Sequence, residues 1–416
     1  MRLTRRAWLG GAGALPIATR LGVSMALEQA VMPVSLPDRA SFEPMPGAFF
    51  DSGSVHPVSR GAKAAVAAYF EARSTPGIGR SSIDEEGILA KFARLINADP
   101  ADVAFVKSTT TAEHLIVDGL GLFDSDAHVV TDTLHFFGSF PLYEGLAQRG
   151  ARVTWVRPVD GRIRIDDMAR AIVPGTRLVA LSLVSTYNGF EHDLAAVCEL
   201  AHARGALVYA DIVHAAGCVP VDVRATGVDF AACSSYKWLM ADFGLGFVYA
   251  RPEAREQLRR KRYGYYGVAS FQSHAYPFDP PGERVADFAM QENATGHFAT
   301  GTYSHATAVH LDHSLAYLLG VGVERINMHA RGLVDSLKEE LARLGYQVVT
   351  PPESRAPIVT CVLENARSLA PRLEAAQVRI NLGRNRFRVT PSVFNTADDV
   401  GRLLTALGPA DAPARG

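Results

Sequence analysis

Two ionisable residues stand directly after short apolar runs that read as buried strands. Asp211 ends the run "ALVYAD", and Lys237 follows the run Val228–Cys233 within "SSYKWLM". Because ligands of open α/β sheets sit beyond the carboxyl ends of the strands, we expect both side chains at such an edge. Each one alone is more often a strand-end residue that makes a local cap or turn. Together they indicate more, since an amine can form a Schiff base with a carbonyl compound and a carboxylate can keep a pyridine nitrogen protonated.

The cofactor that combines an aldehyde with a pyridine ring is pyridoxal phosphate, and its phosphate needs an anion site. The stretch "FVKSTTTAEHL" offers one, because a strand is followed by the hydroxyl residues Ser108–Thr111 and then by a helical pattern. Hydroxyls and free backbone N–H groups at the start of a helix bind anions. Taken alone, this stretch could be an ordinary helix cap. Combined with Asp211 and Lys237, it predicts pyridoxal phosphate as the cofactor.

The elements that must position these residues alternate regularly from about Ala101 onward. Helix-like segments such as Ala195–Ala203 separate most of the apolar runs, which is typical of a doubly wound α/β domain. Several runs are continuous rather than alternating, as in a parallel sheet buried on both faces. The predicted strands of this large domain are Val103–Val106, His128–Thr131, Arg152–Val156, Arg177–Val184, Ala206–Asp211, Val228–Cys233 and Gly244–Ala250.

The pattern changes after about Tyr303, where a long helix-like stretch, Arg325–Leu344, precedes shorter apolar runs. This predicts a smaller C-terminal α+β domain, with a last helix after Thr396. The predicted division of the chain is an N-terminal arm over 27–60, the large cofactor-binding domain over 61–302 and the small domain over 303–416. The Pro-rich "HAYPFDPPGERV" is expected to be a surface loop near the boundary.

Composition excludes several classes of protein. The chain has 416 residues, 48% of them hydrophobic and 20% charged, with a formal net charge of −1 and no basic block, so nucleic acid is not an expected partner. No apolar run reaches the roughly 18 residues that a membrane span needs. The four cysteines are scattered, and His310 and His313, spaced for one helix face, have no evident third ligand. We therefore expect no metal site.

The segment "YADIVHAAGCVPVDVRATGVDFAACSSYKWLMADFGLGFVYARP" resembles the class V aminotransferase family, which has fold type I of the pyridoxal-phosphate enzymes. That family includes cysteine desulfurases, selenocysteine lyases, kynureninase and isopenicillin N epimerase-like proteins. The resemblance runs from about Phe50 to Leu407. It implies that Lys237 is the Schiff-base lysine, that Asp211 partners the pyridine nitrogen, and that His214 hydrogen-bonds the phenolic oxygen of the cofactor.

The same resemblance implies roles for residues around the ring and the phosphate. In "TDTLHFFGSFPLY", His135 matches the aromatic residue that stacks on the ring, with Phe136 as the alternative. The phosphate ligands implied are Thr109, Thr110, Ser234, Tyr236 and Thr302, of which Thr302, in "GTYSHA", reaches the phosphate across a dimer interface. The expected assembly is therefore a homodimer with shared active sites.

Two further residues are candidates for the substrate. "RFRVTPSVFNTADDV" resembles the C-terminal element of the family, which makes Arg388 the clamp for a substrate carboxylate. A guanidinium suits that task because it binds carboxylates bidentately. Asn188, in "STYNGF", could contact the cofactor or the substrate, and it could equally be a turn former before Gly189.

The expected substrate is a small amino acid or amino-acid-derived amine, whose amino group displaces Lys237 from the cofactor. Transamination or cleavage at Cα or in the side chain (C–S or C–C) is the expected reaction, with epimerisation or siderophore maturation in the periplasm as alternatives. Cysteine desulfurases carry a loop cysteine before the C-terminal arginine, whereas "AAQVRINLGRNRFRV" has none and the nearest is Cys361. A desulfurase that forms a persulfide is therefore disfavoured. A protein that binds pyridoxal phosphate without turnover is the hypothesis from a different class.

The N-terminus resembles an export signal. Arg5 and Arg6 precede an uncharged run from Ala7 to Thr19, and "TRRAWL" resembles a twin-arginine motif. Small residues at Ser24 and Ala26 fit a cleavage site, so residues 1–26 are predicted to be a signal peptide and the protein to be periplasmic or exported. The alternative is an N-terminal arm that begins with basic residues on a cytoplasmic protein.

Export is expected to depend on the arginine pair. Replacing Arg5→Lys together with Arg6→Lys should trap the precursor inside the cell, because the pathway recognises the paired guanidiniums. Fractionation of cells that express the double variant measures this. Normal delivery of that variant to the periplasm would rule out the twin-arginine interpretation.

Overall fold

The computed structural model of the chain describes residues 34–75 and 83–410. The predicted signal peptide over residues 1–26 lies outside these residues. Within them, no helix combines the length and the apolar character that crossing a membrane requires.

A seven-stranded sheet forms the centre of the molecule, in the order β2-β8-β7-β6-β5-β3-β4. Six strands run parallel, and β8 is antiparallel to both of its neighbours. The strands are β2 (Val103–Val106), β3 (His128–Asp132), β4 (Arg152–Val156), β5 (Thr176–Ser182), β6 (Leu207–Asp211), β7 (Phe230–Ser234) and β8 (Gly246–Ala250). All seven predicted strands are therefore confirmed, and the fold class is α/β as expected.

Alternate residues of these strands enter two separate cores, because successive side chains of a strand point to opposite faces. Val208 and Ala210 of β6 belong to one core, while Leu207 and Tyr209 belong to the other. The first core is covered by α3 (Glu85–Leu95), α6 (Ile165–Ala171), α7 (Leu194–His202) and α11 (His305–Val321). The second is covered by α4 (Thr109–Gly119), α5 (Phe140–Gln148), α9 (Pro252–Arg255) and α10 (Ala294–Phe298). Burial on both faces explains the continuous apolar runs in the sequence.

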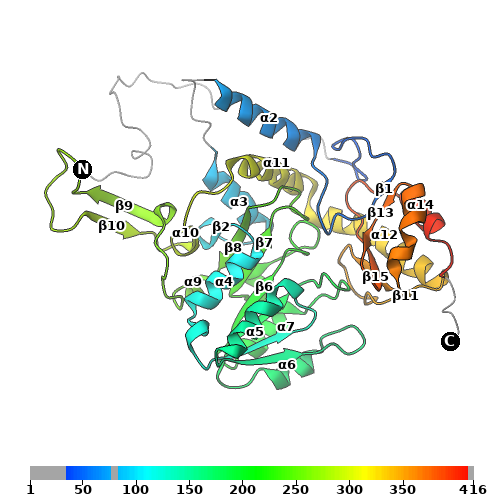
Figure 1. Cartoon of the computed structure of the whole chain (residues 1–416), viewed down its shortest axis with the longest axis horizontal. Helices are drawn as coiled ribbons and strands as arrows, with labels where there is room; N and C mark the ends of the chain where they lie inside the picture. The colour runs from blue at the N-terminus through cyan, green and yellow to red at the C-terminus, as the bar shows by residue number, and fades with distance from the viewer. Residues whose placement is uncertain (1–33, 76–82, 411–416) are drawn as a thin grey trace.

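A second, smaller sheet lies toward the C-terminus, at the end of the molecule drawn in orange and red (Figure 1). Its strand order is β11-β12-β15-β14, all antiparallel. The elements are α12 (Val323–Arg343), β11 (Gln347–Val348), β12 (Val359–Val362), α13 (Ala370–Ala375), β14 (Asn381–Leu382), β15 (Arg386–Val389) and α14 (Ala397–Leu407). Thr396 caps α14 as a capping box.

The N-terminal arm joins this small sheet region. β1 (Ala48–Phe49) pairs in parallel with β13 (Val378–Arg379), and Ala48 and Phe50 are buried in the core of the small domain. Helix α2 (Arg60–Ser74) follows the arm, and α8 (Val223–Thr226) is a single turn between β6 and β7. The predicted domain boundary at residue 302 stays a prediction.

A two-stranded hairpin projects from the large domain on the side away from the small sheet (Figure 1). It is formed by β9 (Val268–Ser273) and β10 (Ala286–Met290), which pair antiparallel. The loop between them is the Pro-rich stretch that was expected to be at the surface, and it is. The hairpin itself was not predicted, because its strands are half-exposed and carry no clear alternation.

Gly217 is a position where the fold tolerates no side chain, and this generates a stability prediction. Its φ is +99°, and a Cβ there would lie 2.4 Å from the carbonyl oxygen of Trp238, beside Lys237. Gly217→Ala should lower the unfolding free energy by about 2–4 kcal/mol, from backbone strain and overpacking together. Urea unfolding measures the loss.

Gly205→Ala is the matched control, because φ is +75° there and a Cβ would meet no atom within 4 Å. It should cost only the backbone strain, about 1–2 kcal/mol. Equal losses in the two variants would contradict the close approach at Trp238.

Candidate active site

The amine of Lys237 lies in a buried position at the carboxyl edge of the central sheet. The residue is 8% exposed, and its Nζ is 3.0 Å from Nε2 of His214. Trp238 Nε1–H donates to His214 Nδ1 over 3.4 Å. An indole nitrogen is a donor only, so this contact places the imidazole proton on Nε2 and directs it at the lysine. Only a neutral amine can accept that proton.

Burial favours this neutral form. Removal from water lowers the pKa of Lys237 to about 8, with Asp211 acting in the opposite direction and Arg388 in the same one. The pKa of His214 is lowered well below its usual value, first by burial and then by the charges of Lys237 and Arg388. The pair is therefore a neutral imidazole beside an amine that loses its proton unusually easily.

Asp211 ends β6, and the sheet register places it beside Ser182 of β5 and Ala232 of β7. Its Oδ1 accepts a hydrogen bond from Val213 N over 2.9 Å, while no partner of Oδ2 is found in the described part of the chain. Burial raises the pKa of Asp211, whereas the Val213 N–H and the charges of His135 and Lys237 oppose that rise. The carboxylate thus keeps one oxygen for a ligand.

The predicted anion site is assembled from two segments that lie far apart in the sequence. Ser108 caps α4, and its Oγ accepts from Thr111 N. Thr109 N donates to Ser234 Oγ over 3.1 Å, and the hydroxyls of Thr109 and Ser234 are 3.2 Å apart. Thr110 occupies the same first turn. The start of α4 and the end of β7 therefore present hydroxyls and helix N–H groups together, as a phosphate requires.

These groups fit pyridoxal phosphate. An amine, a carboxylate with one oxygen uncommitted, and a hydroxyl cradle at a helix start lie along one edge of the sheet, at the ends of β6 and β7 and the start of α4. Lys237, Asp211 and the Thr109–Ser234 pair would hold the aldehyde, ring-nitrogen and phosphate ends respectively.

The two candidates for stacking on the ring, His135 and Phe136, have different surroundings. Both ring nitrogens of His135 have partners, with Nε2 3.0 Å from Oε1 of Glu113 and Nδ1 2.8 Å from Oγ of Ser182. Phe136, the alternative, has its ring centroid 5.9 Å from the Lys237 Nζ. Phe136 is therefore the candidate carried forward, and the ring position stays a prediction. The two residues are adjacent, and the sequence could not tell which side chain turns inward.

His135 instead belongs to a buried network under Asp211. Glu113 accepts from His135, from Ser139 Oγ over 2.6 Å and from Tyr143 Oη over 2.5 Å. Burial alone would lower the pKa of His135, but the charge of Glu113 raises it. The pKa of Glu113 is lowered by His135 despite its own burial. Sequence reasoning missed Glu113 and Ser182, although the strand-end position of Ser182 is the same signal that identified Asp211.

The charge of Arg388 acts on Lys237, although Arg388 comes from the small domain. Its Nη1 donates to Thr186 O over 3.0 Å and to Thr186 Oγ1 over 2.6 Å, and its Nη2 donates to Ser54 Oγ over 2.8 Å. Burial lowers its pKa to about 10. Thr186 and Ser54 were not found from the sequence, because each is an isolated hydroxyl residue in a loop.

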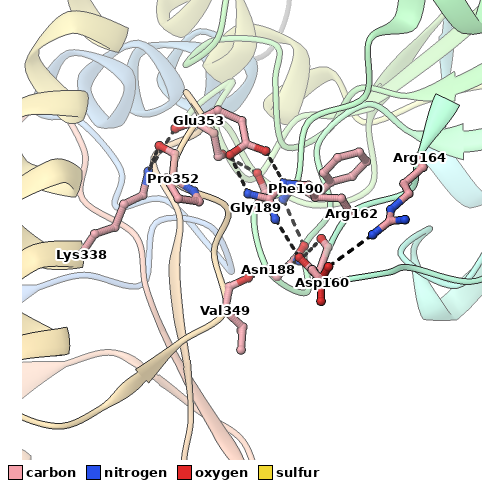
Figure 2. A network of polar contacts seen from close by, with 12 residues as sticks. Asp160, Arg162, Arg164, Asn188, Gly189, Phe190, Lys338, Val349, Pro352 and Glu353 are labelled. Carbon is pink, nitrogen blue, oxygen red and sulfur yellow. Dashed lines mark hydrogen bonds and ion pairs between the residues drawn. The ribbon is translucent and has the colours of Figure 1, made fainter.

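Asn188 is used by the backbone around it, which favours the turn-forming interpretation over contact with the substrate. Its Nδ2 donates to Gly161 O over 2.7 Å, and its Oδ1 accepts from Phe190 N over 3.1 Å. Figure 2 shows the side chain where loops of the large domain meet a loop of the small domain, close to the bidentate pair of Arg162 and Glu353. Asn188 is thus the turn former that the sequence left open as the other interpretation.

Two further predicted phosphate ligands have aromatic neighbours. The ring of Tyr236 stacks on Phe243 with centroids 4.4 Å apart, and its centroid is 5.8 Å from the Lys237 Nζ. Thr302 is exposed, and its Oγ1 is 2.7 Å from the hydroxyl of Tyr265. The role of Thr302 across a dimer interface stays a prediction.

Known proteins that are similar to this chain include pyridoxal-phosphate enzymes. The family model described as "Aminotransferase class-V" matches residues 82–386. An uncharacterized aminotransferase, YcbU, of Bacillus subtilis is 26% identical over 85% of this chain and 90% of its own length. A probable cysteine desulfurase of Halalkalibacterium halodurans is 26% identical over 77% of this chain and 81% of its own.

Solved structures agree on the fold. The cysteine desulfurase CsdA of Escherichia coli superposes with a TM-score of 0.77 at 20% identity, covering 89% of this chain and 96% of that one. C-DES, with glycine covalently linked to its pyridoxal phosphate cofactor, superposes with a TM-score of 0.79 at 17% identity, covering 89% and 99%.

The Glu113 network generates a prediction for stability and its pH dependence. Glu113→Gln removes the counter-charge of a buried imidazolium and should lower the unfolding free energy by about 2–4 kcal/mol near pH 6. The raised pKa of His135 means that its share of this stabilisation is complete below pH 6.5 and is lost as the pH rises through the folded-state value. The difference between wild type and variant should therefore shrink above pH 6.5.

Glu144→Gln changes the same charge at an exposed position of the neighbouring helix α5. It should stay within about 0.5 kcal/mol of wild type at every pH. Denaturant unfolding across the pH range measures both variants. A constant difference for Glu113→Gln would show that His135 is not charged in the folded protein.

Proposed function

The chain belongs to the aminotransferase class-V family and is a pyridoxal-phosphate-dependent enzyme, and on that premise we propose that it acts on the amino group of an amino acid or amino-acid-derived substrate. Transamination or cleavage of a bond at Cα or in the side chain is the proposed reaction. An aminotransferase relative that matches 85% of the chain supports transamination first. The observation that carries the proposal is the buried Lys237 amine, paired with a neutral His214 and close to both Asp211 and Arg388.

Each residue has a defined task in this proposal. Pyridoxal phosphate supplies an electron sink for the bonds at the substrate Cα. Asp211 keeps the ring nitrogen protonated, and Arg388 binds the substrate carboxylate. Lys237, whose pKa is lowered to about 8, takes and returns the proton at Cα. Phe136 has no ionisable group, so the side chain at the ring position supplies no second proton carrier.

The cysteines argue against a desulfurase that forms a persulfide on a loop. All four are buried, and burial raises the pKa of Cys361, the one nearest the C-terminal arginine in sequence, to about 12. The thiolate is the nucleophilic form, so such a thiol is a poor acceptor of sulfur. The relatives named cysteine desulfurases therefore support the family and not that reaction.

We also propose a homodimer in which Thr302 completes the neighbouring phosphate site. Thr302 is exposed within one chain, and the nearby hairpin β9–β10 exposes large apolar residues, among them Tyr276 and Phe288. Large exposed apolar residues on a projecting element are typical of a subunit interface. Export by the twin-arginine pathway is a further proposal, supported by the N-terminal residues alone.

Lys237→Ala should abolish turnover and the absorbance that borohydride reduction removes, because the variant has no amine to link the cofactor. Lys107→Ala is the matched control, since Lys107 is an exposed lysine directly before Ser108 and has no part in the covalent link. Spectra before and after reduction, with mass measurement of the protein, report the covalent link directly. A Lys237→Ala protein that still gains the mass of the reduced cofactor would overturn the assignment.

A screen of the holoenzyme against L-amino acids then tests the reaction. Release of a keto acid identifies transamination, whereas release of sulfide or alanine identifies side-chain cleavage. Absorbance changes without any product would favour a binding protein over an enzyme.

A further inference from the structure

Strand β15 presents two arginines on the face opposite its core. Phe387 and Val389 are buried in the core of the small domain. Because side chains alternate along a strand, Arg386 and Arg388 share the other face, which is turned toward Thr186 and Ser54. The substrate clamp Arg388 therefore has a second guanidinium one step along the same face.

The inner arginine, Arg388, makes no hydrogen bond to a carboxylate in the described part of the chain. Arg388 donates to the neutral acceptors Thr186 and Ser54, and its buried Nε has no partner in the described part of the chain. Asp51 Oδ1 is 4.0 Å from its Nη2. Asp51 also lies 3.7 Å from Nε of Arg379, so one carboxylate faces two guanidiniums.

The outer arginine is held in place by an aromatic ring. The guanidinium carbon of Arg386 is 4.1 Å from the ring centroid of Tyr187, the residue after Thr186. No carboxylate pairs with Arg386 among residues 34–75 and 83–410. Burial lowers the pKa of Arg388, Asp51 opposes this, and the charge of Arg386 lowers it further, which places the two guanidiniums near one another. Stacking on tyrosine orients a guanidinium and leaves its N–H edge open to an anion.

We propose that Arg386, oriented by Tyr187, is a second carboxylate site beside Arg388, and that the substrate is an amino dicarboxylic acid or a derivative with a second carboxylate. The inference rests on the proposed function, in which Arg388 binds the first carboxylate. Two like charges held side by side repel each other, and a dianion relieves that repulsion while filling both forks. A substrate with one carboxylate leaves Arg386 without a partner.

The test compares two anions of five carbons on the holoenzyme, by calorimetric titration. Glutarate should bind at least about tenfold more tightly than pentanoate, since it pairs with both guanidiniums. Arg386→Leu should remove that advantage and change pentanoate binding by less than about twofold. Arg384→Leu, the same charge change at an exposed position two residues earlier, should leave both affinities unchanged. Equal affinities in the wild type, or an unchanged preference in Arg386→Leu, would overturn the proposal.

Arg386→Lys keeps the charge and loses the planar fork, and it should retain part of the preference. It also keeps the test decisive if Arg386→Leu fails to fold, which circular dichroism and cofactor absorbance reveal. An Arg386→Lys protein with the full preference would show that the fork plays no part.

Turnover of L-glutamate and L-norvaline separates this inference from the proposed function. Faster turnover of L-glutamate than of L-norvaline supports both the second carboxylate site and the proposed reaction. Faster turnover of L-norvaline contradicts the dicarboxylate inference and still supports the proposed reaction. Tight glutarate binding without turnover of any amino acid supports the second site and contradicts the proposed reaction.

Discussion

The burial of the Lys237 amine is the constraint on which the rest of the site depends. An ammonium group taken out of water is costly, so it must be paired or must lose its proton. In this protein the surroundings favour loss of the proton. Trp238 fixes the His214 proton on Nε2, and that proton faces a nitrogen that can accept it only when neutral. Burial raises the free energy of the charged amine, and for the same reason it makes Lys237 a usable base.

A second buried charge follows from the first. Asp211 must stay ionised in a setting that raises its pKa, and Ser182, beside it in the sheet, connects it to His135 and Glu113. Compared with apolar side chains of the same volume, a buried ion pair such as His135–Glu113 adds little net stability, although removing one partner alone is costly. Its value lies in placing a positive charge behind the carboxylate. The network therefore supports the electrostatics of the site more than the fold.

The strands, and the residues Asp211 and Lys237 at their ends, were predictable from the sequence for one reason. A sheet covered on both faces produces continuous apolar runs, and strand ends mark the ligand edge, so Asp211, Lys237 and Ser234 could be placed. Loop side chains carry no such signal. His135 and Phe136 are neighbours that differ only in direction, and Thr186 and Ser54 meet Arg388 only after the two domains pack. The orientation of Asn188 likewise depends on Gly161 and Phe190, which no periodicity connects.

The position of Arg388 shows how domain packing and charge act together. The exposed pair Arg162–Glu353 at the domain junction contributes only about 0–1 kcal/mol, as surface ion pairs do. Buried contacts to the backbone hold the junction more firmly, among them Ser354 Oγ–H donating to Gly189 O over 2.5 Å. Within that junction Arg388 is oriented by the neutral oxygens of Thr186 and Ser54, while Asp51 stays 4.0 Å away. A carboxylate at hydrogen-bonding distance would have satisfied the guanidinium and closed it to ligands. Orientation by neutral groups is what leaves a buried arginine able to bind an anion.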